Sequence, residues 1–547
     1  MPRFPWLIML TTAAACVDTD QRPHDEPNAA PPEVLEAAAT TAAALVAPRA
    51  ECANPTASQL DACIDDAWDA LFTDVSVGAR SYFADYVAQA LPGGRAALDD
   101  LRLYGLQRMT GNLLMYAHAH RKVDILKDLA SLYLAIKPGF TTQTTYVVAH
   151  VPKAANGDLA AEGRVDRTVR APSAVANRRR AIKATRYWNE LARPGEANAT
   201  GENILSSSQF MYAVARLIRA TAELPADQRP AELTAFVTSY LTLAVDDHYK
   251  RWVLGRANEV GLFNVPSPWL CGTGKFTHAR YLQLVLAKQF NTTPSYCNLI
   301  TDQDWWIAAG VAELLLARRQ APTLVAFDDP QQALSKYVKT AAAVFASRTR
   351  PTSVEGGLGF GVGEWDDHVD FAFMGYPRAA PLPALTDARA ATGVGWDIRH
   401  ARRWIHLFDS FQTFTRIYGP IEWPTDAQLK GFAVQFAVAV PTVVVDDAGA
   451  RCLKFRNLMS GHNGWYRYTV GMADALATAG PFSRSADAAP AGYAFWSKHD
   501  VRVGNVVRRW MTENAAWMRS SARQLEVLPS LADTRPYPAV EGGCQVP

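Results

Sequence analysis

The densest group of chemically versatile side chains lies between residues 460 and 468. An imidazole, a carboxamide, a phenol and a guanidinium follow closely there, on His462, Asn463, Tyr466 and Arg467. Such groups can accept a proton, donate one and neutralise a carboxylate, which are the tasks of a β-elimination beside a carboxylate. The alternative is a capped, solvated segment with packed aromatic rings.

A second group is acidic, with four carboxylates within seven positions of a glycine-rich segment, on Glu364, Asp366, Asp367 and Asp370. Two carboxylates across a sugar ring hydrolyse a glycosidic bond, one as acid and one as base. In that interpretation the acid is Glu364 or Asp366. The base is Asp367, Asp370 or Asp397. The same loop could bind Ca²⁺, which prefers oxygen ligands, and a solvated turn is the third interpretation.

Flat aromatic rings near such groups are candidates for stacking against sugars. The candidate substrate-binding residues are Trp305, Trp306, Trp365, Trp396, His400 and Trp465. Two further predicted helix starts carry polar side chains, at 201–209 and 396–409. Packing in the core is the alternative for the tryptophans and for His400, and N-capping alone would explain Asp397.

Other classes of site are disfavoured. The sequence has no GxSxG motif of a serine hydrolase and no HExxH motif of a zinc protease. It has no CxxC pair that would suggest bound metal. We therefore expect no required cofactor, with Ca²⁺ at 364–370 as an alternative. The formal net charge is +2, with acidic and basic residues interspersed, which argues against a nucleic-acid partner.

The first sixteen residues have the pattern of an export signal, with Arg3, an apolar run over 4–10 and small residues that lead to Cys16. The segment resembles a bacterial lipoprotein signal. This resemblance implies a lipid on Cys16, attachment to a membrane, and a place in the periplasm or at the cell surface. Ala13 stands where that family usually has leucine, so cleavage as an ordinary signal peptide is the alternative. Residues 17–50 are predicted to be a flexible tether.

Cysteine usage agrees with export. Six cysteines follow Cys16, an even number that suggests disulfides. They are Cys52, Cys63, Cys271, Cys297, Cys452 and Cys544. Pairing of sequence neighbours would join Cys52 to Cys63, Cys271 to Cys297 and Cys452 to Cys544, although six cysteines allow many connectivities.

The apolar periodicity is helical almost throughout residues 55–525. Helices are predicted near 57–73, 77–91, 97–118, 121–137, 203–223, 229–253, 276–290, 302–319, 330–348, 397–418, 426–439, 462–478 and 501–524. Two insertions interrupt them, one at 139–200 with a β-hairpin and one at 350–395 that is rich in loops. A second hairpin is predicted over 442–455. No fixed repeat is visible, which argues against a solenoid.

The number and pairing of these helices resemble an (α/α)6 toroid of about six helical hairpins, a class common among carbohydrate-active proteins. The resemblance covers residues 55–525 and is architectural. It implies a mainly α fold, a single domain over 51–547, and inner helix starts that line a funnel. The expected partner is a poly- or oligosaccharide.

The leading expectation is a polysaccharide lyase that acts on a uronate-containing glycan by β-elimination. Asn463 and Arg467 would neutralise the carboxylate, while His462 and Tyr466 would transfer protons. One alternative is an inverting glycoside hydrolase that uses the 364–370 loop. Another is a glycan-binding envelope lipoprotein without catalytic activity.

Overall fold

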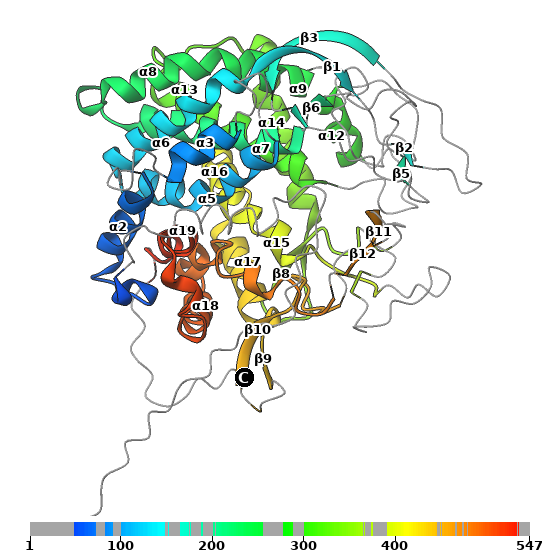
Figure 1. Ribbon diagram of the computed structural model, residues 1–547. Helices are drawn as coiled ribbons and strands as arrows, with labels where there is room; N and C mark the ends of the chain where they lie inside the picture. The colour runs from blue at the N-terminus through cyan, green and yellow to red at the C-terminus, as the bar shows by residue number, and fades with distance from the viewer. Residues whose placement is uncertain are drawn as a thin grey trace, which may run out of the picture.

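The computed structural model describes residues 49–72, 82–90, 100–147, 151–152, 165–173, 175–176, 188–189, 201–202, 204–254, 277–287, 300–364, 366, 374–375, 391–445, 449, 451–464, 468–472, 475–478, 480–532 and 534. Over these residues the protein is mainly helical, as its periodicity predicts (Figure 1). Few strands accompany the helices, and they form short two-stranded ladders.

Most helices lie close to their predicted positions. They are α2 (Leu60–Phe72), α3 (Tyr82–Ala90), α5 (Asp100–Ala119), α6 (Val123–Ile136), α7 (Ile204–Glu223), α8 (Ala231–Thr242), α9 (Arg251–Leu254), α12 (His278–Leu286), α13 (Asp302–Gln320), α14 (Ala333–Arg348), α15 (Ile398–Ala401), α16 (Arg403–Tyr418), α17 (Asp426–Ala439), α18 (Val501–Glu513) and α19 (Ser521–Val527). A π-helical segment, Leu243–Lys250, joins α8 to α9.

Side-chain caps fix where several helices begin. Asp397 accepts hydrogen bonds from two backbone N–H groups of the first turn of α15. Thr301 and Asp304 form a capping box at the start of α13, and Thr425 and Gln428 form another at the start of α17. These caps satisfy backbone donors that a helix start otherwise leaves unpaired.

Four long helices, α5, α7, α13 and α16, pack against one another in the middle of the molecule (Figure 1). Near their N-terminal ends, Tyr104 of α5 contacts Arg403 of α16, which also pairs with Asp302 of α13. At the opposite ends, His118 of α5 contacts Glu223 of α7. The four helices therefore run in the same direction, and their N-termini lie together.

The apolar core beside this group is rich in aromatic rings. Trp305 of α13 stacks on Phe345 of α14, with ring centroids 4.1 Å apart. Phe408 of α16 and Trp423 pack around the same ring. These side chains are almost completely buried, and their area dominates the packing of α13 against α14 and α16.

Both predicted hairpins are present. In the insertion at 139–200, β1 (Thr141–Val147) pairs antiparallel with β3 (Val165–Ser173). Towards the C-terminus, β9 (Pro441–Val445) pairs with β10 (Arg451–Phe455), and this hairpin projects at the bottom of Figure 1. A short ladder of β7 (Thr349–Pro351) and β8 (Leu358–Phe360) opens the second insertion.

The predicted helix over 462–478 is wrong. This part of the chain forms a turn and then an antiparallel pair, β11 (Tyr468–Met472) with β12 (Ala475–Thr478). The run Tyr468–Met472 contains aromatic and β-branched residues, which favour strands. Gly471 within it disfavours a helix. The apolar residues that fit a helical period also fit the two strands of a hairpin.

The predicted Cys52–Cys63 disulfide is confirmed, with the two Cα atoms 5.5 Å apart. It ties the start of the folded chain to α2. Cys452 is also disulfide-bonded, and the cysteines with which it could pair lie outside the described residues. The predicted pairs that involve Cys271, Cys297 and Cys544 therefore stay predictions.

None of the helices in the ranges described above combines the length and the apolar character that crossing a membrane requires. The predicted signal at 1–16, with Cys16, lies outside those ranges. So does the predicted tether at 17–50, apart from its last two residues.

Candidate functional site

Polar side chains form a stripe along each of the four parallel helices, and on α13 the apolar run 305–312 interrupts it. On α16 and the short α15 before it, the stripe contains Arg399, Arg402, Arg403, His406 and Ser410. Steps of three and four residues place these side chains on one face. The stripes of α5, α7 and α13 face this one, so a column of polar groups runs between the helices.

The upper end of the column is the end at which the N-termini of the four helices lie. It centres on a buried tyrosine, Tyr104. Arg403 Nη2 donates a hydrogen bond of 2.7 Å to the phenol oxygen of Tyr104. The same guanidinium forms an ion pair with Asp302, in the first turn of α13. Arg403 therefore links three helices, and it holds a positive charge directly against the phenol.

The charge around Tyr104 changes its acidity. Burial raises the pKa of the phenol, but the positive charges of Arg403 and Arg402 act in the opposite direction, with smaller contributions from Arg399 and His400. The cations outweigh burial and lower the pKa of Tyr104 to about 7. A phenol with this pKa is substantially ionised near neutral pH, so it can take up a proton as a base or return it as an acid.

Two glutamines hold the helix that carries Tyr104. Gln209 Nε2 of α7 donates to Gln107 Oε1 of α5 at 2.7 Å. It also donates to the backbone carbonyl of Tyr104 at 3.3 Å. Both side chains are buried. Because these bonds fix the turn of α5 around Tyr104, the phenol keeps its position against Arg403.

A histidine–aspartate pair lies beside this centre. His400 Nδ1 and Asp397 Oδ2 are 2.6 Å apart. The other carboxylate oxygen, Oδ1, accepts the backbone N–H groups of Arg399 and His400 at 3.0 Å each. Asp397 is thus both an N-cap and the orienting partner of His400. A carboxylate on Nδ1 fixes the orientation of the ring and its tautomer.

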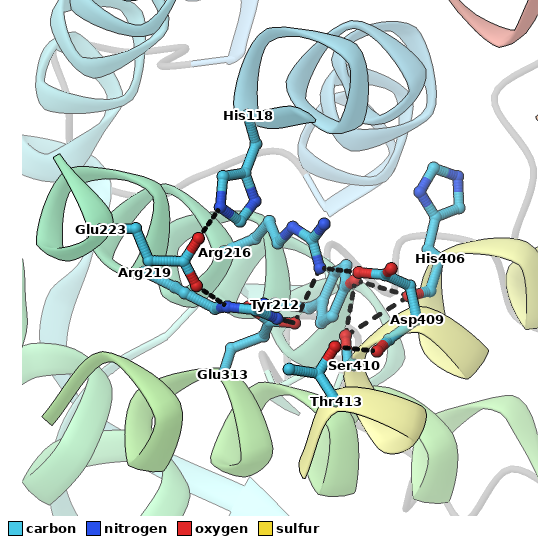
Figure 2. Close-up of polar contacts among 10 residues, drawn as sticks. All are labelled: His118, Tyr212, Arg216, Arg219, Glu223, Glu313, His406, Asp409, Ser410 and Thr413. Carbon is cyan, nitrogen blue, oxygen red and sulfur yellow. Dashed lines mark hydrogen bonds and ion pairs between the residues drawn. The ribbon is translucent and has the colours of Figure 1, made fainter. Parts of the chain in front are cut away.

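The lower half of the column is a network of charged groups that Figure 2 shows in detail. Arg216 donates to Glu313 at 2.9 Å and to Asp409 at 2.6 Å. Arg219 contacts Glu313 at 3.2 Å and Glu223 at 2.6 Å. These bonds connect α7 with α13 and α16.

His118 and Tyr212 complete that network (Figure 2). His118 Nε2 lies 2.8 Å from Glu223 Oε2, and burial lowers the pKa of His118. Tyr212 Oη donates to the backbone carbonyl of His406 at 3.0 Å and lies 3.1 Å from Ser410 Oγ. The two arginines have three carboxylates as partners, so the lower network is internally compensated and holds the helices together.

The upper end is different because one of its buried guanidinium groups has no carboxylate partner among the described residues. Arg108 lies 3.7 Å from Asp487 and 3.8 Å from Glu526, and Asp302 pairs with Arg403. The buried Arg402 guanidinium has no hydrogen bond or ion pair with any of the described residues. The four helix N-termini add partial positive charge at the same end. This end of the column therefore favours a negatively charged ligand.

The segment 457–464, which contains two of the predicted catalytic residues, lies directly beside 396–398. The Met459 N–H donates to the Trp396 carbonyl at 2.8 Å, and the Ile398 N–H donates to the Asn457 carbonyl at 2.8 Å. His462, two residues beyond Ser460, has its Nδ1 atom 2.9 Å from the Ser460 hydroxyl. The predicted segment thus borders the His400–Asp397 pair.

The side chains of that segment do not share a helical face, because the helix is absent. Asn463 Oδ1 accepts the backbone N–H of Phe482 at 2.9 Å, so its carboxamide braces a loop. Tyr466, Arg467 and Trp465 lie outside the described residues. The catalytic roles of His462, Asn463, Tyr466 and Arg467 stay predictions.

The acidic segment also lies close by, since the Gly363 N–H donates to the carbonyl of Val394. Glu364 is buried and pairs with Arg348 at 3.1 Å. Burial raises the pKa of Glu364 to about 7, against the opposing charge of Arg348. Asp366 accepts the backbone N–H groups of Gly393 at 2.6 Å and Val394 at 3.4 Å.

Asp366 therefore links the acidic segment to residues 393–394, and both of its carboxylate oxygens take part. Asp367, Asp370 and Trp365 lie outside the described residues. Within the described ranges, no group of three or more His, Cys, Asp or Glu side chains is placed to hold a metal ion. The expectation of Ca²⁺ at 364–370 stays a prediction for the remaining acidic residues.

Two of the predicted substrate-binding tryptophans belong to the core. Trp305 and Trp306 are at most 1% exposed, so neither ring has a free face for a sugar. Trp306 packs against Tyr212 and His406. Trp396 is also buried, against Phe360 and Trp404. Among the described members of the predicted substrate-binding set, His400 lies at the candidate site.

The sequence carried a signal for the residues that these predictions omitted. Tyr104, Arg402, Arg403 and Asp302 belong to no known motif, but Arg399, Arg402, Arg403 and His406 follow helical spacing on a helix that also needs an apolar face. A polar stripe within a buried helix marks a polar interior. A surface hollow of about 720 Å³ lies at the opposite ends of α13 and α16, beside Arg318 and Tyr418.

Comparison of the chain with models of protein families gave no match, and comparisons with curated proteins and with solved structures also gave none.

Proposed function

We propose that the protein is a polysaccharide lyase that cleaves a uronate-containing glycan by β-elimination at the upper end of the polar column. The observation that carries this proposal is the buried Tyr104 phenol, whose pKa is lowered to about 7 among arginines. Elimination beside a carboxylate needs a base that is free at neutral pH and cations that stabilise the carbanion-like transition state. Both occur in one place here.

The roles follow from the contacts. Tyr104, as phenolate, removes the proton at C5 of the uronate. The electron pair of that C–H bond forms the C4–C5 double bond, and the bond from C4 to the leaving oxygen breaks. His400, oriented by Asp397 at 2.6 Å, donates a proton to that oxygen. The arginines offset the negative charge that builds up on the carboxylate during proton removal.

The helix arrangement supports a closed toroid, which we include in the proposal. Four helices are parallel and adjacent in the order α5, α7, α13, α16. From α16 the contacts continue to the 3₁₀ segment Tyr493–Lys498, then to Leu528–Leu531 and α19, and both of these return to α5. This circuit is what inner helices of a ring would form, with the candidate site at the end where the N-termini meet.

Export and membrane attachment through Cys16 complete the proposal. The Cys52–Cys63 disulfide supports it because structural disulfides persist in oxidising compartments. Labelled palmitate should enter the full-length protein in bacteria, and Cys16→Ser should abolish the label. Signal cleavage at another residue, without lipid, would show that the protein is exported by the ordinary route.

A direct assay tests the proposed reaction. Elimination leaves a conjugated double bond, so products from a uronate polymer should absorb in the ultraviolet. Tyr104→Phe should lower kcat by roughly 10²–10⁴-fold and change KM little. The matched control is Tyr418→Phe, which removes a hydroxyl at the far end of α16. Activity of Tyr104→Phe equal to wild type would place the reaction elsewhere.

Glycoside hydrolysis is the second candidate, because burial raises the pKa of Glu364 to about 7. A carboxyl group with this pKa is suited to donate a proton to a leaving oxygen. Hydrolysis would release reducing ends without ultraviolet absorption, and Glu364→Gln would abolish that release. If Glu364→Gln instead unfolds the protein and leaves the specific activity of the folded fraction unchanged, the Arg348–Glu364 pair is structural.

A further inference from the structure

Arg402 is a buried charged side chain at the candidate site, and its guanidinium has no partner among the described residues. It lies at the junction of α15 and α16, where it ends one helix and begins the other. It is only 8% exposed. Removing a guanidinium from water without a compensating partner is costly. Yet among the described residues the Arg402 guanidinium has neither a hydrogen bond nor an ion pair.

The neighbours of Arg402 show where its charge acts. Burial lowers the pKa of His406, and the charge of Arg402 is the next largest cause, so that the pKa falls to about 3. Arg402 is also the second of the arginines that act on Tyr104. The guanidinium therefore lies within electrostatic range of both side chains, inside the polar column.

The other arginines of the column differ in this respect. Arg403 is held by Tyr104 and Asp302. Arg216 and Arg219 share Glu313. Arg108 lies near Asp487 and Glu526. Arg402 carries the same charge at similar burial and helps to lower the pKa of Asp487, but no carboxylate of the described residues forms an ion pair with it. Four helix N-termini point to the same end of the column.

The opening of the site lies next to Arg402 in the chain. The side chain of His400 is 23% exposed, while Arg399, Arg402 and Arg403 are buried. Arg402 retains slightly more exposure than Arg403. The planar guanidinium can bind two oxygens of one carboxylate.

We propose that Arg402 binds the carboxylate of a uronic acid. This carboxylate would be the negatively charged partner that the guanidinium lacks among the described residues. This inference rests on the proposed function for the identity of the anion, but the anion site itself stands on the unpaired, buried guanidinium. Arg402 would thus select uronates over neutral sugars and place C5 beside Tyr104.

The test uses sodium glucuronate and glucose with the whole protein, by isothermal titration calorimetry. Glucuronate should bind and glucose should not. Arg402→Gln should weaken glucuronate binding roughly ten- to a hundredfold, the loss expected for a charge-assisted hydrogen-bonded contact. Arg319→Gln, on the exposed C-terminal end of α13, removes the same charge elsewhere and should bind glucuronate as the wild type does.

Stability without ligand gives a second, independent readout. Because none of the described residues pairs with the buried Arg402 guanidinium, Arg402→Gln should unfold at an equal or higher urea concentration than the wild type. A fall in stability would show that Arg402 has a structural partner and would overturn the proposal. Equal glucuronate affinity in wild type and Arg402→Gln would also overturn it.

The outcomes separate this inference from the proposed function. If glucuronate binding depends on Arg402 but no uronate polymer yields unsaturated products, the carboxylate site stands and elimination does not. If unsaturated products form and Arg402→Gln leaves kcat/KM unchanged, elimination stands and the assignment of Arg402 fails. Sulfate that competes with glucuronate only in the wild type would further support recognition of oxyanions at Arg402.

Discussion

The Tyr104 phenol and the Arg403 guanidinium are joined by a 2.7 Å hydrogen bond between α5 and α16, across 299 residues of sequence. Arg403 also pairs with Asp302 on α13. The surrounding arginines stabilise the ionised form of Tyr104. The phenolate is therefore a negatively charged partner of these arginines.

The first prediction concerns the titration of Tyr104. With tyrosines labelled at the ring carbon that bears the hydroxyl, NMR should show one phenol that titrates at about pH 7. Tyr104→Phe should remove this transition, and Tyr418→Phe should retain it. A wild-type spectrum with no phenol ionising below pH 9 would contradict the electrostatic account of this site.

The same shift predicts how stability depends on pH. The pKa of Tyr104 is about 7 in the folded protein and near 10 in its ordinary environment. Between these values the unfolded chain holds the proton more tightly, so folding gains stability as pH rises from 7 to 10. The wild type minus Tyr104→Phe difference in unfolding free energy should therefore grow over that range. A constant or shrinking difference in urea titrations would contradict the shift.

The third prediction concerns Arg403. Arg403→Gln removes the nearest positive charge, so burial should dominate and raise the pKa of Tyr104. The NMR titration of Tyr104 measures this pKa directly, whereas the pH dependence of kcat/KM also reports the ionisation of other groups. Arg403→Lys keeps the charge and should move the titration less. Equal titrations in Arg403→Gln and wild type would show that Arg403 does not control this phenol.

The fourth prediction separates the two roles of Asp397. Asp397→Asn keeps an N-cap side chain for α15 but loses the charge that orients His400. It should fold with nearly wild-type stability and lose at least tenfold in kcat. Asp397→Ala should also lose about 1 kcal/mol of stability, the usual value of an N-cap. If both variants retain full activity, Asp397 is a cap and nothing more.

The fifth prediction concerns the lower network of Figure 2. Glu313 is fully buried and neutralises two arginines. Glu313→Gln should destabilise the protein by about 3–5 kcal/mol, because it leaves buried positive charge without its partner. Asp246→Asn, which breaks an exposed pair with Lys250, should cost about 0.5 kcal/mol or less. Similar urea midpoints for the two variants would contradict a structural role for the network.

Much of the secondary structure followed from local pattern. The helices around residues 204–223 and 426–439 and the hairpin at 441–455 lie where periodicity and turn residues place them. These features depend on contacts between residues close in sequence, and side chains three or four apart meet on a helix whatever its neighbours are. The Cys52–Cys63 bridge, eleven residues apart, belongs to the same class.

The segment 462–478 shows the limit of such patterns. Its apolar residues recur at a helical period, but the same spacing is also compatible with two short strands that pair with each other. The tryptophans of α13 show a similar limit. Their position after the polar residue Asp304, at the start of a helix, suggests that the rings are exposed. Only the packing of α14 and α16 against α13 shows that Trp305 and Trp306 are buried.

By itself the sequence determined that the chain is mainly helical and where most helices begin and end, including a helix that starts near residue 397. Only the tertiary structure decided that Tyr104, Asp302 and Arg403 meet. Each lies on a different helix, and no local rule relates positions about 100 to 300 residues apart in sequence. Their chemistry arises because four parallel helices place their N-termini together, where burial and unpaired charge change what a phenol and a guanidinium can do.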